Sequence, residues 1–145
     1  MVSVIIPFYN AKQYVCEALA SAVVQEYVHE VILVDDCSTD DSAACVQAWL
    51  DAHEAQTADI SIRVLQNAEN SGVAVSRNRG VQESSGKYVA FLDADDRFAP
   101  GKLKKQVELL EQTGACLCNT ARVLIRPDGS LTQTIMHSPE KITLA

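Results

Sequence analysis

Residues 30–40 read Glu-Val-Ile-Leu-Val-Asp-Asp-Cys-Ser-Thr-Asp, a continuous apolar run that ends in acidic and hydroxyl side chains. Such a run is typical of a strand covered on both faces, as in the parallel sheets of α/β proteins. Residues 2–7 and 88–92 have the same character, whereas residues 60–66 alternate apolar and polar. We therefore expect three strands covered on both faces and a fourth at a half-exposed edge.

Helical patterns fill the gaps between these runs, and Pro100 and Gly114 suit the first turn and the end of the last helix. The predicted helices are residues 11–25, 42–55, 73–83 and 100–114. Residues 115–125 predict a further strand, with a hairpin partner at 130–135. The alternation predicts a Rossmann-like α/β fold, with a mostly parallel central sheet and helices on both faces.

Length and charge narrow the classes of partner. The chain has 145 residues, which suits a single domain over residues 1–145, and its formal net charge is −7. This charge argues against nucleic acid and against an anionic membrane surface as partners. No apolar run reaches the roughly 18 residues of a membrane span, and the start lacks a basic signal region, so we expect a cytoplasmic protein without a transmembrane segment.

The five cysteines match no zinc-binding spacing. Without a secretion signal we expect them to be reduced thiols that mostly fill the core.

Polar side chains follow all four predicted strands. Parallel sheets bind ligands beyond the carboxyl ends of their strands, so these positions are the candidate site. They are Tyr9 and Asn10, residues 35–40, Asn67 with residues 70–72, and residues 93–96.

Asp93, Asp95 and Asp96 place three carboxylates within four residues. In an extended segment Asp93 and Asp95 point the same way and can share a target. Hard oxygen ligands suit Mg²⁺ or Mn²⁺. The alternative is an acidic helix N-terminus ahead of Pro100, which would be favourable to the helix dipole.

Other candidate residues also have two interpretations. Asp35 or Asp36 can accept a hydrogen bond from a nucleobase or ribose, or can form an Asx turn and helix cap. Tyr9 can be the wall of a nucleobase pocket or a half-buried strand end. Arg77 can bind a phosphate or carboxylate, and both Arg77 and Arg79 can instead be solvated helix charges.

Four ordered segments resemble the family 2 glycosyltransferases of the GT-A fold, over roughly residues 1–125. They are VSVIIPFYN at 2–10, VDDCSTD at 34–40, NSGVAVSRN at 70–78 and GKYVAFLDADD at 86–96. Cys37 departs from the pattern, because the family usually has glycine or asparagine there, and we expect the cysteine to be tolerated.

This resemblance implies a nucleotide-diphospho-sugar donor, with a UDP-sugar favoured, and Mn²⁺ or Mg²⁺ as cofactor. The acceptor would be an unidentified glycan, lipid or protein. The resemblance assigns Pro7 and Tyr9 to the nucleobase pocket, Asp36 to a nucleobase hydrogen bond, Gly72 and Asn78 to the nucleotide pocket, Asp93 to ribose or metal, and Asp95 to the metal of a D-x-D motif.

The resemblance also implies an inverting transferase whose general base is a carboxylate in a later, acceptor-side segment. After Gly114 the acids are Asp128 and Glu140, and neither lies in a recognisable base motif. We therefore assign no base and expect it beyond residue 145. The chain is expected to be the donor-binding part, with membrane association only through parts it lacks.

Two alternatives to a transferase remain. One is a binding module without catalysis, which the short length favours. The other is a nucleotidyltransferase of related fold, but residues 7–12 lack the glycine-rich basic loop of those enzymes.

Overall fold

The computed structural model describes residues 1–126 and 128–136. The chain divides into two compact units, residues 1–105 and 106–145. The first unit contains a parallel sheet with its helices, and the second contains an antiparallel hairpin. Helix α5, Lys102–Thr113, spans the boundary between them in the sequence.

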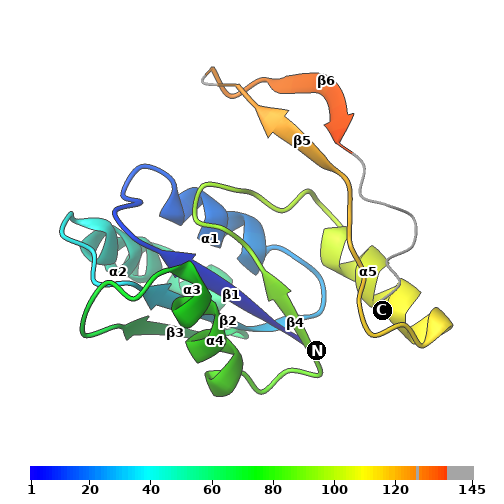
Figure 1. Ribbon diagram of the computed structural model, residues 1–145, viewed down its shortest axis with the longest axis horizontal. Helices are drawn as coiled ribbons and strands as arrows, with labels where there is room; N and C mark the ends of the chain where they lie inside the picture. Colours follow the sequence, from blue (N-terminus) through cyan, green and yellow to red (C-terminus); the bar gives the residue numbers. More distant parts are fainter. Residues whose placement is uncertain (127, 137–145) are drawn as a thin grey trace. The chain divides into compact units, whose positions relative to one another are not determined.

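A four-stranded parallel sheet organises the first unit (Figure 1). Its strand order is β3-β2-β1-β4, and the register places Ile5 of β1 between Ile32 of β2 and Phe91 of β4. All residues of β1 are buried, so this central strand forms the core, as predicted. The strands are β1 (Val2–Phe8), β2 (Val28–Asp35), β3 (Ser61–Gln66) and β4 (Tyr88–Phe91).

Helices cover both faces of this sheet. The chain steps from β1 to β2 to β3 in one direction, then returns past β2 and β1 to reach β4. Right-handed crossovers place α1 and α2 on one face and α4 on the other (Figure 1). The predicted α/β fold is confirmed. The helices are α1 (Val15–Val23), α2 (Ser42–Ala52), α3 (Glu54–Thr57) and α4 (Val73–Glu83).

Helix α4 packs closely on β1 because two small residues face the sheet. Ser76 and Gly80 are buried and lie one helical turn apart. A Cβ atom at position 80 would lie 2.5 Å from Ile5 Cγ2, so only glycine allows this approach. The close packing holds the loop that precedes α4 at the carboxyl end of the sheet.

A hydrogen-bond network around Glu30 joins the strands at the opposite, amino end. Glu30 is 3% exposed and accepts hydrogen bonds from Ser3 Oγ (2.6 Å), Arg63 Nη2 (2.7 Å) and Ser85 N (3.0 Å). Burial raises the pKa of Glu30, but these hydrogen bonds outweigh it and lower the pKa to about 2. The Gly86 N–H also donates to Ser3 Oγ (2.8 Å), so the network anchors the loop before β4.

Three details differ from the sequence-based expectations. Strand β4 is exposed on one face, with Val89 38% and Phe91 47% exposed, because it lies at an edge of the described sheet. The helix predicted at 42–55 is interrupted at His53, which has φ −121° and separates α2 from α3. The strand predicted at 115–125 is confined to β5 (Arg122–Ile125), which pairs with β6 (Leu131–Met136).

The cysteines also differ from expectation. All five are free thiols, but none is buried, so their interpretation as core filler was wrong. Across the residues that the structure describes, no helix combines the length and the apolar character needed to cross a bilayer.

Candidate functional site

The structure places the main candidate residues along one edge of the sheet, here called the carboxyl rim. Tyr9 follows β1, Asp36 follows β2, Asn67 follows β3, and Asp93 and Asp95 follow β4. Because the strands are parallel, their carboxyl ends all lie at this edge. β2 and β4 are separated by β1 alone, so these two strands lie about 10 Å apart across the sheet.

Asp36 holds the N-terminal end of α4. Its side chain is nearly buried, with 4% of the residue exposed. Oδ1 accepts hydrogen bonds from Asn67 Nδ2 (2.7 Å) and Ser71 N (3.0 Å), and Oδ2 accepts one from Gly72 N (2.7 Å). Burial raises the pKa of Asp36, but these hydrogen bonds outweigh it and lower the pKa overall. The carboxylate is therefore ionised and fixed in orientation at neutral pH.

Gly72, the residue before α4, has φ 86°, in the left-handed region that favours glycine. A Cβ built there would meet no atom within 4 Å, so the space beside this backbone is open. The residue therefore offers an accessible backbone at the rim.

Asp35 has the structural role that the sequence allowed. It is 1% exposed, and its Oδ1 accepts the N–H of Ser38, three positions later, at 2.8 Å, which fixes the start of the loop after β2. Its Oδ2 accepts a hydrogen bond from Gln66 Nε2 at 3.3 Å. The two neighbouring aspartates thus have separate partners, and Asp36 is the one bonded to the α4 loop.

Cys37 has φ 64°, which explains why its position in the motif favours glycine or asparagine. The cysteine adopts the same left-handed conformation at a steric cost. Its Sγ lies 3.9 Å from the carbonyl oxygen of Ala68, in the loop after β3.

Asn10 joins the loops that follow β1 and β2. Its Oδ1 accepts hydrogen bonds from Thr39 N (2.8 Å) and Asp40 N (3.2 Å), and its own N–H donates to Ser38 Oγ (3.0 Å). These bonds hold Tyr9, which is 46% exposed, beside the loop after β2. The sequence indicates Asn10 only as a polar residue after the first strand, because its partners lie 28–30 positions away along the chain.

Two arginines of α4 bind rim residues. Arg77 Nη2 donates to Asp93 Oδ1 at 2.5 Å, and its guanidinium carbon lies 5.8 Å from the centre of the Phe91 ring. Arg79 Nη1 donates to Asn67 Oδ1 at 2.7 Å. The interpretation of both arginines as solvated charges was therefore wrong, and the carboxylate partner allowed for Arg77 is Asp93.

The acidic turn after β4 suits a metal ion shared with a ligand. Asp93 and Asp95 lie in a turn closed by a hydrogen bond from Asp96 N to Asp93 O (3.0 Å). Within residues 1–126 and 128–136, no three His, Cys, Asp or Glu side chains form a group that could enclose an ion. Mg²⁺ is often bound by one or two carboxylates together with substrate phosphates, and two aspartates fit that arrangement.

Two predicted nucleotide-binding residues lie apart from this group. Pro7 is buried within β1, where it pairs with Val34. Asn78 is exposed on α4 and lies two positions after the buried Ser76, about 200° around the helix, on the side away from the sheet. Their roles remain predictions.

The acids considered for a general base are also away from the rim loops in sequence. Asp128 lies in the turn between β5 and β6 and accepts a hydrogen bond from Ser130 N (2.9 Å). The Ser130 hydroxyl and, second to it, this backbone N–H lower the pKa of Asp128. Glu140 lies outside the described residues.

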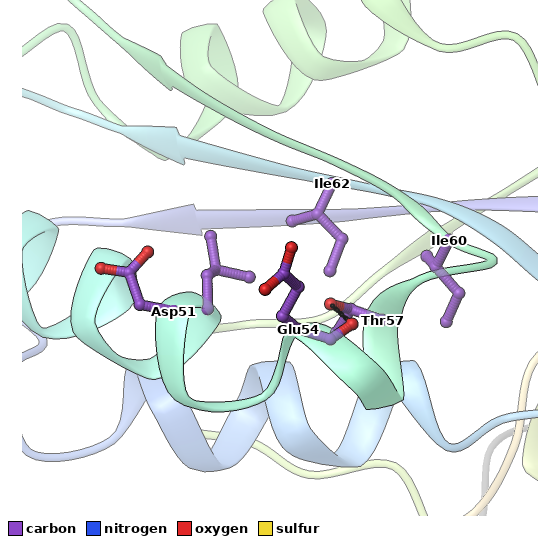
Figure 2. Close-up of a pocket in the computed structure, with 6 residues that line it drawn as sticks. Asp51, Glu54, Thr57, Ile60 and Ile62 are labelled. Atoms are coloured by element: carbon purple, nitrogen blue, oxygen red, sulfur yellow. Dashed lines mark hydrogen bonds between the residues drawn. The ribbon is translucent and has the colours of Figure 1, made fainter.

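A pocket of about 430 Å³ lies beside α2, α3 and the start of β3 (Figure 2). None of the predicted site residues contributes to it. Its lining residues are Leu50, Asp51, Glu54, Thr57, Ile60 and Ile62.

Comparison with known proteins agrees with the sequence motifs. The family profile described as "Glycosyl transferase family 2" matches residues 3–141. TuaG of Bacillus subtilis strain 168, a glycosyltransferase named for teichuronic acid biosynthesis, is 38% identical over 144 residues, which cover 99% of this chain and 55% of TuaG.

Solved structures of GT-A glycosyltransferases share the fold. Residues 1–349 of Staphylococcus aureus TarS in complex with UDP superpose with a TM-score of 0.66 at 30% identity, covering 86% of this chain and 34% of that one. The mannosyltransferase PcManGT of Pyrobaculum calidifontis, in complex with GDP-Man and Mn²⁺, gives 0.67 at 27% identity, covering 88% and 36%. The chain thus spans about half of TuaG and about a third of the solved chains.

Proposed function

The chain belongs to glycosyl transferase family 2, and from this membership we propose that its carboxyl rim binds the nucleoside diphosphate of a sugar donor. The reaction would transfer the sugar to a glycan, lipid or protein acceptor. The observation that carries the proposal is the placement of Tyr9, Asp36 and the Asp93–Asp95 turn at the ends of three adjacent strands. The nucleotides bound to TarS and PcManGT give further support.

Asp36 and Tyr9 would bind the nucleobase. Oδ2 of Asp36 accepts one backbone N–H, and a carboxylate oxygen has lone pairs for two. We propose that the second lone pair accepts an imino N–H, which uracil, thymine and guanine carry and cytosine lacks. The exposed ring of Tyr9 offers an aromatic face for stacking, and the open backbone of Gly72 allows a close approach. Among these donors we favour a UDP-sugar. Pro7 and Asn78 keep their predicted roles in the surrounding nucleotide pocket.

Asp93 and Asp95 would hold Mn²⁺ or Mg²⁺ against the two donor phosphates. Arg77 binds Oδ1 of Asp93, so we assign Oδ2 of Asp93 and the exposed Asp95 carboxylate to the ion. When bound, the ion supplies Lewis-acid stabilisation of the negative charge on the leaving nucleoside diphosphate. Arg77 meanwhile fixes the orientation of the Asp93 carboxylate.

The family resemblance also supports transfer with inversion, in which a carboxylate base deprotonates the acceptor hydroxyl. We assign no residue of this chain to that step. The second candidate is donor binding without transfer. It is favoured because every role that we assign to a residue of the carboxyl rim concerns the donor. Release of UDP from a UDP-sugar with and without acceptor extracts distinguishes the two candidates.

A thermal-shift series with UDP, GDP, CDP and ADP, each with and without Mn²⁺, tests donor binding. UDP with Mn²⁺ should raise the melting temperature, because a ligand at 100 times its Kd stabilises the native state by about 2.7 kcal/mol. Asp95→Asn should remove the part of the shift that needs Mn²⁺, and Asp51→Asn, on α2, is the matched control. No shift with any nucleotide would contradict donor binding. A Mn²⁺-dependent shift that persists in Asp95→Asn would contradict the metal assignment.

A further inference from the structure

Asn67 is a nearly buried amide at the end of β3, with 8% of the residue exposed. Its Nδ2 donates to Asp36 Oδ1 (2.7 Å) and to Ser76 Oγ (2.9 Å), and its Oδ1 accepts a hydrogen bond from Arg79 Nη1 (2.7 Å). The side chain therefore uses both of its N–H groups and its oxygen in contacts with three other residues. It links α4 to the loop that follows β2.

The orientation of this amide is set by the chemistry of its two charged neighbours. A guanidinium group can only donate hydrogen bonds, and an ionised carboxylate can only accept them. Rotating the amide by 180° would place N–H against N–H at Arg79 and oxygen against oxygen at Asp36. Arg79 is itself anchored by a bond from Nη1 to the backbone oxygen of Gln66 (2.6 Å).

Asp36 depends on this amide for a charge-assisted hydrogen bond in a buried setting, where such bonds are strong. The other charged groups nearby are Asp35, a like charge bonded to Ser38 and Gln66, and Arg79, on the far side of Asn67. The Asn67 amide thus connects Arg79 to Asp36, because its oxygen accepts a hydrogen bond from the guanidinium and its N–H group donates one to the carboxylate.

We propose that Asn67 and Arg79 are positioning residues for nucleotide binding: Arg79 orients the Asn67 amide, and the amide holds the Asp36 carboxylate where the nucleobase meets it. This inference rests on the proposed function, because it assumes that Asp36 binds a nucleobase. It adds two residues that would affect nucleotide affinity without touching the nucleotide.

The decisive variant is Asn67→Asp, which keeps the size of the side chain and replaces the donor by a second carboxyl group beside Asp36. The measurement is the Kd of UDP with Mn²⁺ by titration calorimetry from pH 5 to pH 7.5. Dividing each variant's Kd by the wild-type Kd at the same pH removes the pH effects that the variant and the wild type share.

At pH 7.5 the Asn67→Asp variant should bind UDP roughly 30-fold more weakly than the wild type. The ratio should shrink towards pH 5, because two adjacent carboxyl groups raise the pKa of one of them, and the protonated group can donate again. Arg79→Ala should weaken binding about fivefold and Arg79→Lys less, since lysine keeps one charged donor. A residue that only supports the fold gives no such pH dependence.

Gln47→Glu is the matched control, because Gln47 is an exposed amide on α2 that also donates to an aspartate, Asp51 Oδ1 (2.8 Å). It should leave the Kd unchanged at every pH. The melting temperature of each variant without nucleotide reports the effect on folding separately.

The outcomes separate this inference from the proposed function. If the wild type binds no nucleoside diphosphate, the proposed function fails. If the wild type binds UDP and Asn67→Asp binds it equally well, or more weakly by the same factor at every pH, the positioning role is refuted. If Asn67→Asp does not fold, the arginine variants decide, and a wild-type Kd in Arg79→Ala overturns the inference.

Discussion

Replacing Glu30 by glutamine removes the charge at the centre of the network that joins the amino ends of the strands. Glu30 is 3% exposed, and its hydrogen bonds from Ser3, Arg63 and Ser85 lower its pKa from the ordinary 4.5 to about 2. Such a depression corresponds to about 3 kcal/mol of preference for the ionised form in the native state. Glutamine keeps an acceptor oxygen but places an amide against Arg63, so most of this stabilisation should be lost.

The sign of the pH dependence follows from the lowered pKa. A carboxyl group with a depressed pKa in the native state contributes its stability above about pH 4.5, where the unfolded chain is also ionised. That contribution falls as the pH drops from 4.5 towards 2. The difference between wild type and Glu30→Gln should therefore be about 2–3 kcal/mol at pH 7 and shrink steadily below pH 4.5.

Urea unfolding at pH 7, 5, 4 and 3, followed by circular dichroism, measures this difference. Glu54→Gln is the control, since Glu54 is an exposed acid on α3 and should cost less than about 0.5 kcal/mol. A loss in Glu30→Gln that stays constant with pH, or that is no larger than the loss in Glu54→Gln, would refute the reasoning about the charge.

Three further predictions concern the packing and the rim. Gly80→Ala should destabilise the fold by about 1–3 kcal/mol in thermal unfolding, because the new Cβ would lie 2.5 Å from Ile5 Cγ2; an unchanged melting temperature would mean that α4 shifts without cost. Cys37→Gly should stabilise the protein by up to about 1 kcal/mol, since φ 64° is strained for cysteine, and a lower melting temperature would contradict this. Asn10→Ala should weaken UDP binding about tenfold through loss of the side-chain bonds to Thr39 and Asp40; a wild-type Kd in calorimetry would show that Tyr9 is held by other contacts.

The strands and the carboxyl rim could be predicted because both depend on local patterns. Continuous apolar runs indicated β1 and β2, alternation indicated the edge strand β3, and the polar residues after each strand indicated the rim. The continuous run at 88–92 predicted a strand covered on both faces, but hydrophobicity does not specify which strand lies at an edge. Phe91 is therefore exposed despite its apolar surroundings in the sequence.

The partners within the rim could not be predicted from local patterns. Asp36 binds Asn67, Ser71 and Gly72, which lie 31–36 positions later and meet it only through the packing of α4 on β1. Arg79 was indicated by the sequence only as a charged residue of the predicted helix, because its bond to Asn67 depends on the same packing. The left-handed backbone at residue 37 could be anticipated only from the family's preference for glycine or asparagine there.

The double use of Asp36 constrains how this domain can change its donor during evolution. The carboxylate that we assign to the nucleobase also accepts the backbone N–H groups of Ser71 and Gly72. Replacing this aspartate during evolution by another side chain that binds a nucleobase would leave those two backbone N–H groups without their acceptor. The N-terminal end of α4 would then lose the hydrogen bonds that hold it. New donor preferences should therefore arise first at neighbouring positions such as Tyr9, while the aspartate stays in place.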